Sequence, residues 1–92
     1  MPELCRFYGI IITMYRELGG RHHYPHIHAQ YGEHRAVFRI PDAERMEGNL
    51  PRREQRLIEA WIELRQAELM ANWQGLNVPQ GSPTFTRIEP LN

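Results

Sequence analysis

Histidine is the most unevenly distributed residue type in this chain, because all five copies lie between positions 22 and 34. They are His22, His23, His26, His28 and His34. Imidazole titrates near neutral pH and binds divalent metal ions, so such a cluster is typical of metal binding or proton transfer. On an extended strand, His26 and His28 point to the same side, with β-carbons about 6–7 Å apart.

A metal site on this pair requires at least one further ligand. Zinc usually takes three or four protein ligands, and His22 from the preceding loop is the candidate that joins His26 and His28. The alternative third ligands are His23, Glu17 and Glu33. A His-x-His pair on a strand also occurs without metal, with the rings bonded to carbonyl or carboxylate oxygens of the fold. We therefore expect no cofactor, and a divalent metal such as zinc is the alternative.

General acid–base catalysis is a second use of the same histidines. Arg21, Arg35 and Arg39 lie near them in the sequence and could hold an anionic substrate, as in small metal-independent ribonucleases. No spacing fixes these residues into one site, however. Whatever its chemistry, the predicted binding surface is the strand at 26–28 with the loop at 21–25. Its candidate residues are His26, His28, Arg21, Tyr24 and Arg35.

The charge balance argues against strong binding of nucleic acid. Eleven basic and eleven acidic side chains give a formal net charge of zero. Sequence-independent binding to the phosphate backbone of nucleic acid requires a clear excess of basic side chains. The apolar share of 41% is ordinary for a globular chain, and 92 residues predict a single domain over residues 1–92.

Cysteine content and hydropathy indicate the cytoplasm. The single Cys5 has no partner for an internal disulfide, and no apolar run approaches the roughly 18 residues of a membrane span. The N-terminus also lacks the basic and apolar blocks of a signal peptide.

The first half of the chain predicts β-strands over about 3–48. Residues 2–15 have β-branched side chains in a row and form one strand interrupted at Gly9. Residues 26–31 and 35–40 flank Gly32-Glu33, which predicts a hairpin, and 45–49 is a further strand.

The second half predicts one long helix over about 51–74, with Gly75 as its stop. Leu57, Ile58, Trp61, Leu64 and Leu69 form its apolar side. A loop follows at 76–83, and residues 84–89 form a last strand or an ordered tail. The expected fold class is α+β, a small antiparallel sheet with one long helix packed across a face.

Several short segments, spread over nearly the whole chain, resemble the motifs of a known protein family. They are Arg6-Phe7-Tyr8-Gly9-Ile10, Pro25-His26-Ile27-His28-Ala29, Leu50-Pro51-Arg52-Arg53, Glu68-Leu69, Asn72-Trp73 and Ile88-Glu89-Pro90-Leu91. With them, the chain resembles domain-of-unknown-function family 4160 (DUF4160), small bacterial proteins with a Pro-His-x-His motif. His26 and His28 fall on that motif. Tyr24 replaces the first of two prolines common in the family, and the additional His23 is a local departure.

The resemblance implies a protein partner rather than a particular reaction. Genes of the family often neighbour the gene of another small domain, similar to a toxin–antitoxin arrangement. We therefore expect a non-enzymatic protein-binding module whose partner is a neighbouring gene product. The alternative is a metal-dependent or acid–base nuclease that uses His26 and His28. The two classes differ in one requirement, since a nuclease needs the histidines to converge on a cleft with an acid or a metal.

Overall fold

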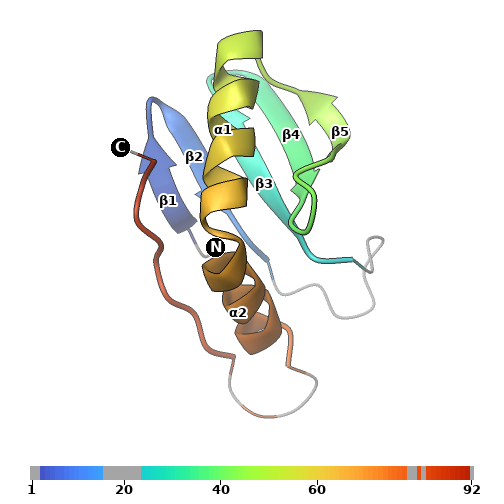
Figure 1. Ribbon diagram of the computed structural model, residues 1–92, viewed down its shortest axis with the longest axis vertical. Coiled ribbons are helices and arrows are strands. Elements are labelled where there is room, and N and C mark those ends of the chain that lie inside the picture. The colour runs from blue at the N-terminus through green and yellow to red at the C-terminus, as the bar shows by residue number, and fades with distance from the viewer. Residues whose placement is uncertain (1–2, 16–23, 79–80, 82, 92) are drawn as a thin grey trace.

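The computed structural model describes residues 3–15, 24–78, 81 and 83–91. Five strands are followed by two helices, and the strands form one antiparallel sheet in the order β1-β2-β3-β4-β5 (Figure 1). The bounds are β1 Glu3–Phe7, β2 Ile10–Thr13, β3 His26–Tyr31, β4 His34–Arg39, β5 Arg45–Asn49, α1 Arg52–Leu64 and α2 Gln66–Leu76. The expected α+β class with an antiparallel sheet is confirmed.

The segment expected as one strand through Gly9 is instead a hairpin of β1 and β2. Phe7 pairs with Ile10, which leaves Tyr8 and Gly9 as a two-residue turn. Both turn residues have positive φ, 49° at Tyr8 and 79° at Gly9, as a type I′ hairpin turn requires. The strand prediction was wrong here because the β-branched run from Ile10 to Thr13 hides the turn that precedes it.

The other strand predictions agree closely with the sheet. The hairpin around Gly32 and Glu33 joins β3 to β4, with Tyr31 opposite His34. Residues 45–49 form β5, which pairs with β4. A bulge shifts the register of this pairing between Val37 and Phe38. Successive strands are therefore neighbours throughout the sheet.

Two helices replace the single long helix that the sequence predicts. The chain departs from helical geometry at Arg65, where φ is −112° and ψ is 21°, and α2 begins at the next residue. Neither Pro nor Gly marks this point, so the local signals for a helix end are absent. Leu64 is the last residue of α1 and is 67% exposed, which contradicts its expected place in the core.

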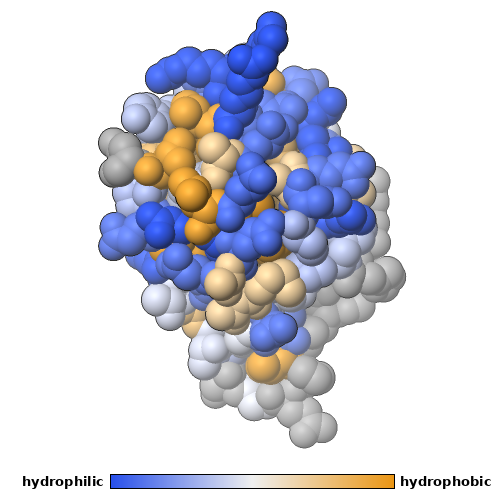
Figure 2. Space-filling model, viewed as in Figure 1, coloured by the Kyte–Doolittle hydropathy of each residue, from blue (hydrophilic) through white to orange (hydrophobic). Residues whose placement is uncertain are grey.

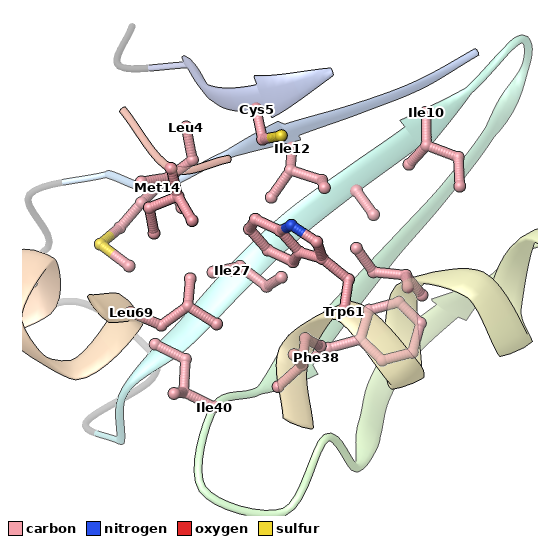
Figure 3. Close-up of a cluster of buried hydrophobic side chains, with 14 of the residues drawn as sticks. Leu4, Cys5, Ile10, Ile12, Met14, Ile27, Phe38, Ile40, Trp61 and Leu69 are labelled. Carbon is pink, nitrogen blue, oxygen red and sulfur yellow. The ribbon is translucent and has the colours of Figure 1, made fainter. Parts of the chain in front are cut away.

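The core lies between the helices and one face of the sheet (Figures 1 and 3). Trp61 of α1 is fully buried at its centre, and its ring lies 5.7 Å from that of Phe7. Ala36 and Phe38 of β4 and Ile40 directly after it occupy alternate positions and are all buried. Among the described residues, the other fully buried apolar side chains are Leu4, Ile10, Ile12, Met14, Ile27, Ile58, Ile62 and Leu69. Burial of this kind is the main stabilising contribution to a domain of this size.

Residues 83–91 form an ordered extended tail rather than a strand. The tail runs beside α2 and α1 to the outer edge of β1 (Figure 1). The amide of Ile88 donates to the carbonyl oxygen of Leu4, and the indole Nε1 of Trp61 donates to the carbonyl oxygen of Glu89 at 2.8 Å. Gly75 lies inside α2 rather than ending it, and a β-carbon there would collide with Thr84 of the tail.

The helix side of the molecule is mostly polar at its surface. Figure 2 shows hydrophilic side chains over most of this side, with smaller hydrophobic areas between them. None of the described helices is long and apolar enough to cross a membrane.

Candidate functional site

The candidate site lies on the sheet face opposite the helices. Ile11, Thr13 and Tyr15 occupy every second position along β2 and just after it, and all three are only partly buried. The residues between them, Ile12 and Met14, are in the core. On β3 and β4, the residues with the same orientation are His28, Gln30, Arg35, Val37 and Arg39. His26 shares this side by alternation, but Trp73 of α2 packs against it at the start of β3 and it is fully buried. The alternation of side chains along each strand therefore separates a core face from an open face.

The strand register places the open-face residues in rows across the sheet. Thr13 lies opposite His28, His28 opposite Val37, and Val37 opposite Glu47. In the adjacent row, Ile11 lies opposite Gln30, Gln30 opposite Arg35, and Arg35 opposite Asn49. Directly opposed side chains are close enough to act on one ligand.

These rows enclose a concavity of about 590 Å³. Its described lining includes Ile11, Tyr15, His28, Arg35, Val37 and Glu47. The volume is within the range of about 300–1,000 Å³ that is typical of ligand sites, which also combine apolar surface with a few polar groups. The sheet face can therefore receive side chains of another molecule.

His26 and His28 lie on the same side of β3, as their spacing predicts. Their ring centroids are 5.2 Å apart, and the ring of Tyr15 contacts that of His28 edge-on at 4.7 Å. His28 is partly exposed and lines the concavity. The pair therefore belongs to one aromatic cluster at the end of the sheet.

His26 is fully buried, which contradicts its predicted place on a binding surface. Trp73 of α2 packs against it with ring centroids 5.0 Å apart. The Nδ1 atom of His26 lies 2.9 Å from the carbonyl oxygen of Tyr24, which can only accept, so Nδ1 carries the proton in this contact. His26 therefore fixes the start of β3, and Tyr24 contributes its carbonyl oxygen and a ring 5.8 Å from that of His26.

The metal hypothesis depends on residues that the described part of the chain does not include. His22, His23, Arg21 and Glu17 lie outside the described residues. Within residues 3–15, 24–78, 81 and 83–91, no group of three His, Cys, Asp or Glu side chains could hold a metal ion. Glu33 is an exposed residue of the β3–β4 turn.

Two arginines of the predicted anion-binding set have different surroundings. Arg39 bonds to Asp42, with 3.2 Å between Nε and Oδ1, and Asp42 raises the pKa of Arg39. Arg35 is exposed, lines the concavity and makes no ion pair with any described residue. Arg35 is therefore the arginine that remains available to a ligand of this face.

Sequence reasoning missed Ile11, Tyr15, Val37 and Glu47 as site residues. Ile11 and Val37 belong to segments that were predicted as strands, but their role as the floor of a concavity depends on the pairing of four strands. Tyr15 carried a weak signal, since it continues the Ile11 and Thr13 series.

The architecture is that of a small α+β domain with a five-stranded meander and helices on one face. Residues 9–74 match the family model described as a domain of unknown function (DUF4160). The chain belongs to this family, and the resemblance noted from its motifs is confirmed. The matched range includes β2 to β5 and α1, while β1 and the tail lie outside it. No curated protein and no solved structure matches the chain.

Proposed function

We propose that this protein is a non-enzymatic protein-binding module and that the open face of its sheet is the binding surface. The observation that supports this proposal best is the concavity of about 590 Å³ with a mixed lining. Ile11 and Val37 supply apolar area, and Tyr15, His28 and Arg35 supply an aromatic ring and donors around it. Tyrosine and arginine are enriched at protein interfaces because they combine large contact area with polar groups.

The described residues give less support to a nuclease. A metal-dependent reaction through His26 and His28 requires His22 or another ligand from outside the described residues, and His26 is fully buried between Trp73 and the carbonyl oxygen of Tyr24. The zero net charge is also unfavourable for RNA or DNA. The proposed binding module needs no cofactor, and it acts in the cytoplasm.

The proposed partner is the small protein encoded beside this gene in bacteria, in an arrangement similar to a toxin–antitoxin pair. This part of the proposal rests on the family resemblance alone. An interface on the sheet face would bury Ile11 and Val37, which are only partly buried in the isolated chain.

A charge placed on the open face tests the proposal. Val37→Arg adds a long cation inside the concavity, and we expect at least a tenfold loss of affinity for the purified neighbouring gene product, measured by calorimetry. Leu64→Arg is the matched control, because Leu64 is 67% exposed on the helix side. Both variants should retain the wild-type circular dichroism spectrum. Equal affinity of wild type and Val37→Arg, or loss only in Leu64→Arg, would exclude the open face as the interface.

A further inference from the structure

We propose that the segment bound by the open face is an extended acidic peptide strand in which a carboxylate precedes an apolar side chain by two residues. Arg35 receives the carboxylate, and the floor of the concavity at Val37 receives the apolar side chain. This inference rests on the proposed function, since it names the chemistry of the partner at the same surface.

The surroundings of Arg35 favour an anion. Its direct cross-strand neighbours are Gln30 on β3 and Asn49 on β5, so neither residue paired with Arg35 carries a charge. The guanidinium has five N–H donors in a planar fork, and a carboxylate can accept from two of them at once. The nearest acidic residue in register is Glu47, which lies opposite Val37 rather than Arg35.

Other arginines of the sheet differ from Arg35 in this respect. Arg6 pairs with Glu3 at 2.9 Å, and Arg39 pairs with Asp42. Arg45 donates to the carbonyl oxygen of Gly48. Arg35 makes no such contact with a described residue, so a partner's carboxylate would compensate its charge without displacing an existing ion pair.

The spacing of the acidic and apolar groups follows from β4. Arg35 and Val37 are two residues apart on one strand and point to the same face, about 6–7 Å from each other along the strand. An extended segment that runs parallel to β4 presents its own alternate side chains at the same interval and in the same order, with the carboxylate first.

Two short peptides test the inference. The probes are the blocked peptides acetyl-Thr-Glu-Thr-Val-Thr-amide and its counterpart with Gln in place of Glu. Titration into ¹⁵N-labelled protein should shift the amide resonances of β3 and β4, and the Glu peptide should bind about fivefold more tightly. The preference should decrease as salt is added, because the ion pair is exposed to solvent.

Variants of two arginines assign the preference to one side chain. Arg35→Gln should abolish the preference for the Glu peptide, whereas Arg6→Gln should retain it, since Arg6 already pairs with Glu3 on the same face. Equal binding of both peptides to wild type, no shift with either at millimolar concentration, or an unchanged preference in Arg35→Gln would overturn the inference. If the peptides give one of these results while Val37→Arg still weakens binding of the protein partner, the binding module stands and only the acidic segment is wrong.

Discussion

His26 and His28 belong to one short motif, yet their environments assign them different roles. His26 is fully buried, packs on Trp73 and contacts the carbonyl oxygen of Tyr24, so it connects β3 with α2 and with the loop before the strand. His28 is partly exposed and lines the concavity beside Tyr15. The motif therefore combines a structural residue with a surface residue, and Ile27 between them points into the core.

Replacement of each histidine by alanine should separate these roles. His26→Ala leaves a cavity against Trp73 and removes a buried polar contact, and we expect a loss of about 2–4 kcal/mol in the free energy of unfolding. His28→Ala should cost less than about 1 kcal/mol, because the side chain is partly solvated. Urea unfolding followed by tryptophan fluorescence measures both values. A similar loss in the two variants would contradict the structural role of His26.

Among the elements, the helical region is the part whose boundaries the periodic apolar pattern of the sequence did not predict. The apolar side predicted for one helix over 51–74 included both Trp61 and Leu64. The break at Arg65 gives α1 and α2 separate buried sides, with Ile58, Trp61 and Ile62 on α1 and Leu69, Asn72 and Leu76 on α2. Arg65 has no helix-breaking side chain, so tertiary packing and not local propensity decides the break.

Alanine variants of Trp61 and Leu64 test the orientation of α1 through the free energy of unfolding. Trp61→Ala should lower the free energy of unfolding by about 3–5 kcal/mol, because the indole is fully buried and its Nε1 donates to the carbonyl oxygen of Glu89. Leu64→Ala should change it by less than about 0.5 kcal/mol, since Leu64 is 67% exposed. Chemical denaturation of the two variants in parallel checks this. A large loss in Leu64→Ala would mean that α1 is oriented differently.

The strands were predicted more accurately than the site for a physical reason. β-Branched runs and period-two alternation are local signals, and they placed β3, β4 and β5 within a residue of their observed bounds. The same spacing placed His26 and His28 on one side. The burial of His26 depends on Trp73, which lies far along the chain, and the concavity depends on the register of several strands. Such contacts between distant segments have no local signature.

At the scale of the whole molecule, the tail joins the two ends of the chain and both layers of the fold. Asn72 of α2 makes two hydrogen bonds with the backbone of Thr86, at 2.8 Å to its carbonyl oxygen and at 2.7 Å from its amide. Ile88 is buried and donates to Leu4 on the outer edge of β1. An uncovered edge strand can pair with another chain, so the tail also protects this edge of the sheet.

A chain that ends after residue 82 should therefore be much less stable. The loss of the Ile88 side chain from the core costs about 1.5–3 kcal/mol. The carbonyl of Leu4, the indole of Trp61 and the amide of Asn72 also lose their partners in the tail, at about 0.5–1.5 kcal/mol for each bond. We expect a total loss of about 3–7.5 kcal/mol, which is a large part of the stability of a domain of this size. Urea unfolding measures the loss, and light scattering should detect self-association through the exposed β1 edge.

Two point variants of the full chain distinguish the tail's contacts from a nonspecific effect of truncation. Ile88→Ala should reproduce much of the loss, because its side chain is 5% exposed in the core. Glu89→Ala is the matched control, since Trp61 bonds to the backbone oxygen of Glu89 and the exposed Glu89 side chain is not required. Its unfolding midpoint should remain at the wild-type value. If Ile88→Ala and the shortened chain unfold at the same urea concentration as the wild type, the tail does not stabilise the fold, and β1 must be held by its pairing with β2 and its core contacts, such as that of Phe7 with Trp61.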